Sequence, residues 1–385
     1  MGQTKKAGLF FIGEFPEGDV HASRIRNITD GLIEGSWSCD LVSMYPTRFS
    51  SDFCEDQVSD YKGQLITRIG NWGKYPATRL SRIGQLVRCH IQFILFIWKN
   101  RRTYDVQYFY TPQWISTLPG LIISKILRNT IVVDYTDLHS ARNNVILHKT
   151  EEWIFFGLSD QVLVISNYLY VFFNRWKKKM TLVPLMIDFN RFKNDVERVR
   201  YSIGYIGSFG KKDGFQTILD ALQLAVQENK SIHLYLIGDL TNNRDIHAAI
   251  DQKGLGKNIV LIGKVKVEEI AKRLQSCSAF IMNRDKSSFA SSGYPIKLGE
   301  YLASDRPVLM SDGQSYSEEY QDGVHVLKYK QDDVKSLAGV MLHCFDKYAK
   351  SQEISKNGYS LAKEKFKTEE VSKTIVHLFN NLLKT

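Results

Sequence analysis

The residues best suited to chemistry lie between Arg284 and Met310, in the segment RDKSSFASSGYPIKLGEYLASDRPVLM. A predicted strand ends before this segment, a Ser- and Gly-rich loop follows, and Pro295 is typical of the first turn of a helix. Lys297 would lie in that first turn, where backbone N–H groups and the helix dipole favour an anion such as phosphate. Glu300 would lie on the same face and could accept hydrogen bonds from sugar hydroxyls. Spacing alone does not separate this interpretation from an ordinary solvated helix.

A second group of candidates lies in the loop Glu14–Asn27, which follows the first predicted strand and opens a helix. Gly18 permits a tight turn. His21, Arg24 and Arg26 could bind anionic groups, although arginines on helix surfaces are more often simply solvated.

The elements that position these residues follow a regular alternation. Short apolar runs typical of buried strands are separated by helix-length segments: AGLFFIG, CDLVSMY, VQYFYT, IVVDYT, QVLVIS and TLVP in the first half, then YSIGYIG, IHLYLIG, IVLIG, AFIMN and PVLMS. This pattern predicts an α/β fold with two doubly wound, Rossmann-like domains. Two such domains would face each other across a cleft at the carboxyl ends of their strands.

The predicted boundary follows Pro184, where a polar stretch begins at Asp188 and runs to Arg200. We expect a first domain over 1–188, a second over 189–367, and a terminal helix over 368–385 that can return to the first domain.

Composition supports two globular domains. The chain has 385 residues, 43% hydrophobic and 24% charged, which excludes disorder of the whole chain. Its five cysteines are scattered without a Cys-x-x-Cys pair, so we expect neither a disulfide framework nor a zinc site. That usage favours a reducing compartment, and we expect a cytoplasmic protein.

Several common chemistries lack their motif. Neither half has Gly-x-Gly-x-x-Gly after its first strand, and there is no Gly-Lys-Ser/Thr phosphate loop. No two aspartates are separated by a single residue, so the Asp-x-Asp pattern of metal-dependent sugar transfer is missing. We therefore expect no metal and no bound cofactor.

From Ser292, the segment SGYPIKLGEYLASDRPVLMSD resembles the nucleotide-sugar motif of family 4 glycosyltransferases (glycosyl transferases group 1), which have the GT-B fold. Gly293, Tyr294 and Glu300 match the motif, while Ser292 stands where the family usually has a first glutamate. The resemblance implies that these four residues bind the donor and that Glu300 binds its ribose. Arg284 and Lys297 would supply positive charge beside the diphosphate.

Four further segments extend this resemblance: Val183–Phe192, Tyr205–Gly214, Ile237–Leu240 and Glu318–Leu327. In the family, the second of these often carries an arginine and a lysine on the donor diphosphate. Here Ser208 occupies the arginine position, and Lys211 or Lys212 could supply the charge.

The first half resembles the acceptor side of the same family. The segment Val132–Arg142 is similar to its active-site loop, which implies that Asp137 and His139 face the cleft as catalytic residues with Lys297. For His139 the alternative is a loop histidine that caps a backbone carbonyl. The loop with Gly18, His21 and Arg24 would cover the acceptor and the donor phosphates.

The resemblance implies a retaining, metal-independent hexosyltransferase. It would move a sugar from a nucleotide-diphosphate sugar, its co-substrate, to a hydroxyl of a glycan or lipid-linked glycan in surface polysaccharide synthesis. A nucleotide-sugar 2-epimerase of the same fold and a catalytically inactive sugar-nucleotide-binding subunit are the alternatives.

Charge distribution adds a possible partner. Residues 1–200 carry 26 basic and 19 acidic residues, a net +7 of the +10 of the whole chain. Basic residues flank the apolar centre of Arg79–Arg102, and a second basic and aromatic cluster spans Phe172–Met180. Such segments suit the anionic inner face of the cytoplasmic membrane, whereas the alternative for the first is a core helix with basic ends. No nucleic-acid-binding motif accompanies them, so nucleic acid is not an expected partner.

Overall fold

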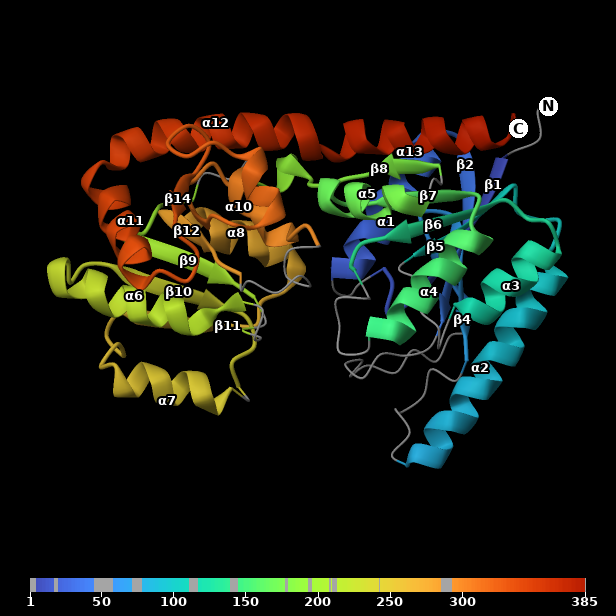
Figure 1. Cartoon of the computed structure of the whole chain (residues 1–385), viewed down its shortest axis with the longest axis horizontal. Helices are drawn as coiled ribbons and strands as arrows, with labels where there is room; N and C mark the ends of the chain where they lie inside the picture. The colour runs from blue at the N-terminus through green and yellow to red at the C-terminus, as the bar shows by residue number, and fades with distance from the viewer. Residues whose placement is uncertain are drawn as a thin grey trace. The chain divides into compact units, whose positions relative to one another are not determined.

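A computed structural model of the chain describes residues 5–16, 20–44, 58–70, 78–110, 117–138, 145–176, 179–192, 196–207, 209, 213–241, 243–284 and 293–384. The chain divides into two compact units (Figure 1). The first contains Met1–Met186 and Thr368–Thr385, and the second contains Ile187–Lys367. This division falls two residues before the predicted boundary at 188/189.

The first unit is built on a sheet whose described strands have the order β3-β4-β2-β1-β5-β6-β7-β8. All neighbours are parallel except β3, which runs antiparallel to β4. The strands are β1 (Lys5–Ile12), β2 (Trp37–Met44), β3 (Val58–Tyr61), β4 (Gln64–Ile69), β5 (Val106–Tyr110), β6 (Ile131–Tyr135), β7 (Gln161–Val164) and β8 (Met180–Leu182). The helices are α1 (Val20–Glu34), α2 (Arg79–Lys99), α3 (Leu118–Ile126), α4 (Val145–Leu158), α5 (Asn167–Phe173) and α13 (Thr368–Leu382).

Helices cover both faces of this sheet. On one face, Leu9 of β1 and Tyr108 of β5 lie in a core cluster with Ile25 of α1. On the other, Phe10 and Phe109 pack against Phe93 of α2 at ring-centroid distances of 5.4 and 6.5 Å. Because successive strand residues point to opposite faces, α1 and α2 lie on opposite sides of the sheet. This double cover explains why the strands read as continuous apolar runs.

The C-terminal helix α13 belongs to the core of the first unit. Its residues Val371, Ile375 and Phe379 join the cluster that contains α1, and Phe379 meets Trp37 edge to face. Two glycines, Gly31 in α1 and Gly35 in the turn after it, permit the close approach: a Cβ atom at Gly31 would clash with Ser372, and one at Gly35 would lie 2.6 Å from Cγ1 of Val376.

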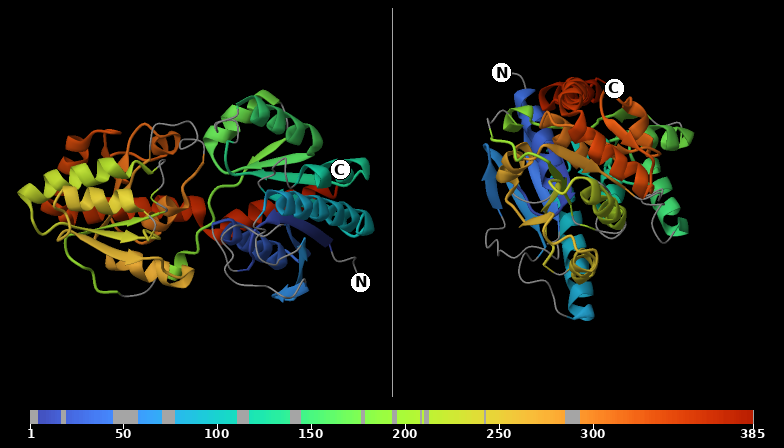
Figure 2. Two further views of the ribbon diagram at one scale, coloured as in Figure 1. Left: turned by 90° about the horizontal axis from the view of Figure 1, so that it is seen from below. Right: turned by 90° about the vertical axis from the view of Figure 1, so that its left-hand side faces the viewer.

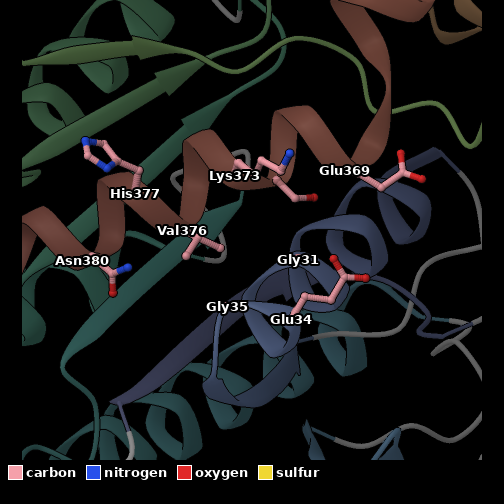
Figure 3. A pocket seen from close by; sticks show the side chains of 9 residues that line it. Gly31, Glu34, Gly35, Glu369, Lys373, Val376, His377 and Asn380 are labelled. Carbon is pink, nitrogen blue, oxygen red and sulfur yellow. The ribbon is translucent and has the colours of Figure 1, made fainter.

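A surface groove of about 470 Å³ lies along this helix pair (Figure 3). It is lined by residues of α1 and α13 and the turn after α1: Gly31, Glu34, Gly35, Glu369, Ser372, Lys373, Val376, His377 and Asn380. Because α1 leads back to the start of β2, Glu34 and Gly35 lie toward the amino ends of the strands. Ligands of open α/β sheets bind at the carboxyl ends, so we assign this groove to helix packing.

Replacing Gly31 with alanine is expected to destabilise the protein by roughly 1–3 kcal/mol, because the new methyl group forces α1 and α13 apart. Gly339, exposed on α11, is the matched control: nothing lies within 4 Å of a Cβ atom there. Gly339→Ala should stabilise by about 0.5–1 kcal/mol through helix propensity. Urea unfolding of both variants measures the difference, and two changes of the same sign would contradict the proposed close packing.

The second unit is built on a fully parallel sheet with the described order β11-β10-β9-β12-β13-β14. The strands are β9 (Ser202–Ile206), β10 (His233–Ile237), β11 (Ile259–Gly263), β12 (Ala279–Met282), β13 (Val308–Ser311) and β14 (Leu327–Tyr329). The helices are α6 (Phe215–Glu228), α7 (Arg244–Gln252), α8 (Val267–Ser276), α10 (Ile296–Ala303), α11 (Val334–Asp346) and α12 (Tyr348–Phe366). This is the strand order of the dinucleotide-binding Rossmann fold, and the predicted α/β class with two Rossmann-like domains is confirmed.

Candidate active site

The topology of the second unit marks one place for a ligand. From β9 the chain adds β10 and β11 on one side, then returns to add β12, β13 and β14 on the other. At this switch point the loops after β9 and β12 diverge and leave a crevice at the carboxyl ends of the strands. Helix α10 lies over both strands: the Tyr301 hydroxyl accepts a hydrogen bond from the Ile206 backbone N–H at 2.8 Å, and its ring stacks on Phe280.

Lys297, in the first turn of α10, lies at this switch point. Its ammonium donates to the Tyr205 hydroxyl of β9 at 2.8 Å and forms an ion pair with Oδ1 of Asp213 at 2.9 Å. The side chains of Lys297 and Asp213 are only 12% and 4% exposed. Burial raises the pKa of Tyr205 well above its usual value, and the Asp213 charge adds to this, so the phenol stays neutral. Lys297 is therefore not a solvated helix residue: two buried side chains hold its charge in place.

Glu300 follows one turn later on α10. Burial raises the pKa of its carboxyl to about 7, against the opposing effect of the Arg191 charge. Nη1 of Arg191 lies 4.0 Å from Oε1 of Glu300. The site thus contains a carboxyl group that changes charge near neutral pH, beside a fixed lysine.

Arg284 and Asn283 follow β12 on the other side of the switch point. The amide of Asn283 is fully buried and donates to the backbone carbonyls of Asp213 and Gly214 at 3.0 Å each. The Arg284 charge partly offsets the rise that burial causes in the pKa of Tyr205. The structure therefore brings Arg284 into the same electrostatic neighbourhood as Lys297.

The predicted donor residues Gly293 and Tyr294 precede α10, and both are buried. The Tyr294 hydroxyl lies 2.8 Å from the Tyr320 hydroxyl and 3.3 Å from Oε2 of Glu319, and its ring packs against Phe366. Tyr294 thus fixes the entry into α10 through its side chain. Contact with a donor would involve the backbone here.

Six predicted site residues lie outside the described part of the chain: Gly18, His139, Ser208, Lys211, Lys212 and Ser292.

Arg24 differs from its predicted place in an acceptor loop. It is 5% exposed and forms a two-pronged ion pair with Asp134 of β6, with Nε–Oδ2 at 2.7 Å and Nη2–Oδ1 at 3.1 Å. It also donates to the backbone carbonyls of Val183 and Pro184. Burial alone would lower the pKa of Arg24, and the Asp134 carboxylate more than offsets this, so the guanidinium stays charged. Arg24 ties α1 to the sheet instead of facing an acceptor.

His21 and Asp137 lie at the carboxyl edge of the first sheet. Nδ1 of His21, in the first turn of α1, lies 2.9 Å from the hydroxyl of Tyr110, the last residue of β5. Asp137 follows the neighbouring strand β6 and is half-buried. Since the strand order reverses between β1 and β5, His21 lies at the switch point of the first unit, and Asp137 lies one strand away.

Three residues of the site are missing from the sequence predictions: Tyr205, Asp213 and Arg191. Tyr205 and Asp213 lie within Tyr205–Gly214, and Arg191 lies in Val183–Phe192, both segments that resemble the family. The signal was present, but neither segment shows by itself which of its side chains meets Lys297 or Glu300.

Asp213→Asn is expected to destabilise the second unit by about 3 kcal/mol, because it leaves a largely buried ammonium without its carboxylate. Denaturant unfolding measures this loss. Asp220→Asn is the matched control, because the side chains of the Asp220–Lys253 pair are more exposed, at 33% and 19%. Exposed ion pairs stabilise the folded state by only roughly 0–1 kcal/mol. Equal effects of the two changes would argue against a buried Asp213–Lys297 pair.

No group of three or more His, Cys, Asp or Glu side chains among the described residues could hold a metal ion. None of the described helices combines the length and apolar character needed to cross a bilayer.

Comparisons with known proteins agree with this architecture. Residues 186–361 match the family model described as glycosyl transferases group 1. Sucrose-phosphate synthase from Thermosynechococcus elongatus has a TM-score of 0.80 at 16% identity, with 99% of each chain covered. Anabaena HepE in complex with UDP and glucose has a TM-score of 0.75 at 15% identity, covering 97% of this chain and 99% of HepE.

A glycosyltransferase from Rickettsia africae has a TM-score of 0.73 at 12% identity, with both chains fully covered. Among curated protein sequences, none matches significantly. The structural likeness shows the fold, and the family match covers the unit that carries Lys297 and Glu300. Residues 186–361 therefore match the glycosyl transferases group 1 family, and the whole chain has the GT-B fold of these solved glycosyltransferases.

Proposed function

We propose that the protein is a retaining glycosyltransferase that moves a sugar from a nucleotide-diphosphate sugar to a hydroxyl of a glycan or lipid-linked glycan. The observation that carries the proposal is the Lys297 ammonium, held by Asp213 and Tyr205 at the switch point of a glycosyl transferases group 1 domain. The pathway we propose is surface polysaccharide synthesis in the cytoplasm.

The proposed reaction needs charge stabilisation more than a protein nucleophile. The bond between the anomeric carbon and the diphosphate oxygen breaks, and the acceptor oxygen bonds to the same face of that carbon. The acceptor proton passes to the departing diphosphate, which gains negative charge. Lys297 and Arg284 would stabilise that charge in place of a metal ion, because they are positioned before the reaction begins.

The other residues have supporting roles in this proposal. Glu300 would accept hydrogen bonds from the donor ribose, and Gly293 would let the backbone approach the donor. Ser208, Lys211, Lys212 and Ser292 remain donor-side candidates from the sequence. On the acceptor side we propose Asp137, His139 and His21, with Gly18 in the covering loop.

A uridine nucleotide is the donor to test first. HepE, whose fold this chain shares, is described in complex with UDP and glucose. Thermal unfolding with UDP, GDP and their sugars tests the choice, because a ligand at 100 times its Kd stabilises the native state by about 2.7 kcal/mol.

Incubation with radiolabelled donors then identifies the reaction. Label transferred to a glycan or lipid-linked acceptor supports the proposal. Conversion of the donor without an acceptor would identify an epimerase, and tight donor binding without turnover would identify an inactive binding subunit. Sugar products of inverted anomeric configuration would contradict the retaining mechanism.

A further inference from the structure

Helix α2 has apolar side chains on two opposite faces. Its inner face carries the buried residues Cys89, Phe93 and Ile97, which pack toward the sheet and α3. The alternative of a core helix is therefore confirmed for this face of α2. Figures 1 and 2 show α2 at the margin of the first unit, with its N-terminal end extending beyond the sheet.

The outer face carries a second apolar stripe, which we call the α2 stripe. Its six residues are spaced by three or four positions, so they follow one line along the helix surface. They are Leu80, Ile83, Val87, Ile91, Leu95 and Trp98, and each is between 51% and 83% exposed. Single exposed apolar residues need no explanation, whereas a continuous row of six marks a surface that meets an apolar partner.

Positive charge surrounds the stripe. Arg79, Arg88 and Lys99 are exposed on the helix, and Arg101 and Arg102 are exposed just after it. The 21 residues of α2 include no aspartate or glutamate. The Arg101 guanidinium lies 5.5 Å from the Trp98 ring centroid, so a cation and an aromatic ring meet at the C-terminal end of the stripe. Such pairs are typical of the interface between headgroups and acyl chains.

We infer that the α2 stripe is a docking surface for an anionic lipid bilayer. The helix would lie in the plane of the membrane, with its apolar row among the upper acyl segments and its basic residues at the headgroups. The charge around the stripe favours a bilayer over a second copy of the chain. Two copies packed through their α2 stripes would bring their basic residues together, and neither helix has an acidic residue to pair with them. The neighbouring helix α3 also exposes two apolar side chains, Ile122 and Ile126, at 42% and 67%.

The second basic and aromatic cluster, Phe172–Met180, is partly buried. Phe173 is fully buried in the first unit, and Phe156 stacks on Trp176. Arg175 lies 4.1 Å from the centroid of the Phe172 ring. Lys177 and Lys178 lie outside the described residues.

Docking through α2 rests on the proposed function in one respect: it would hold the enzyme at the membrane surface, where a lipid-linked acceptor lies. Vesicle binding is therefore measured without donor or acceptor, and UDP binding is measured separately on the same preparations. Loss of one property without the other distinguishes a failed docking surface from a failed donor site.

The test is cosedimentation of the full chain with vesicles of phosphatidylcholine, with and without phosphatidylglycerol. We expect binding to the anionic vesicles at 0.1 M salt and release at 1 M salt, since the Debye length falls from about 10 to about 3 Å. Ile91→Ser with Leu95→Ser should weaken binding about tenfold or more. Val260→Ser with Leu261→Ser is the matched control, because these residues are 36% and 46% exposed on β11 of the second unit.

A charge variant keeps the test independent of helix packing. Arg101→Gln with Arg102→Gln should weaken anionic binding about 25-fold, since each basic residue near the surface contributes about 1 kcal/mol, a factor of about five. Lys335→Gln with Lys356→Gln, both exposed in the second unit, should change little. Absence of binding at 0.1 M salt, or binding that survives both α2 variants, would overturn the inference. A dimer in light scattering that dissociates in the Ile91/Leu95 variant, without vesicle binding, would assign the stripe to a second copy instead.

Discussion

Lys297→Ala is expected to lower the turnover number by about 10²–10³-fold, the usual effect of removing one preorganised group that stabilises developing charge. The donor Michaelis constant should change far less, because the negative charge on the departing diphosphate grows toward the transition state. Steady-state kinetics with saturating acceptor measures both quantities. A raised Michaelis constant with unchanged turnover would mean that Lys297 only binds the donor.

The effect of Lys297→Ala requires a control variant, because this change also removes the ion-pair partner of Asp213. The Asp213 carboxylate, which is 4% exposed, is then left buried without a counter-charge. The double variant Lys297→Met with Asp213→Asn removes both charges and should recover much of the lost stability. Its turnover should stay as low as that of Lys297→Ala. Recovery of turnover together with stability would show that Lys297 acts only as the structural partner of Asp213.

Glu300→Gln is expected to weaken donor binding by about 1.5–3 kcal/mol, the range for hydrogen bonds to a charged group. This corresponds to roughly 10–150-fold in donor affinity, measured by calorimetry with the nucleotide sugar. Glu300→Asp, which retains the charge at a shorter reach, is the conservative comparison. Unchanged affinity of Glu300→Gln would remove Glu300 from the donor site.

The raised pKa of Glu300, about 7, adds a pH dependence with a defined sign. Between the ordinary carboxyl pKa and about 7, the unfolded chain ionises Glu300 while the folded protein keeps it protonated. The stabilising contribution of this carboxyl is thus fully present below its ordinary pKa and lost as pH rises through about 7. Unfolding of wild type relative to Glu300→Gln should show this loss, while the donor affinity of wild type should rise over the same range as the ribose acceptor ionises. A constant difference in stability between the two proteins from pH 4 to pH 8 would show that Glu300 titrates normally.

Local sequence patterns determined the fold class and part of the proposed donor site. Buried parallel strands are continuously apolar, so the alternation of strands and helices could be read directly. Lys297 and Glu300 could be predicted together because residues three positions apart on one helix are neighbours in space, whatever the rest of the chain does. The resemblance to group 1 glycosyltransferases starts from the same short segment and extends to five others along the chain.

Partners far apart in the chain were decided only by the tertiary structure. Lys297 and Asp213 are separated by 84 residues, and Arg24 and Asp134 by 110. No spacing rule connects such pairs, because strand order and crossovers bring them together. The same arginine that suited an acceptor loop by its type is therefore a buried partner of Asp134, and Asp213 was absent from the predicted site.

Helix α2 shows the same division. The sequence alone determined a helix with an apolar centre and basic ends, and it left open whether that centre lies in the core. Both long faces of the helix are apolar, so periodicity could not say which one the protein covers. Packing decided: Phe93 meets Phe10 and Phe109 of the sheet, whereas Leu80 and Leu95 on the opposite face remain exposed. Burial depends on which elements lie next to a helix, and for α2 those neighbours are chosen by the order of strands in the sheet.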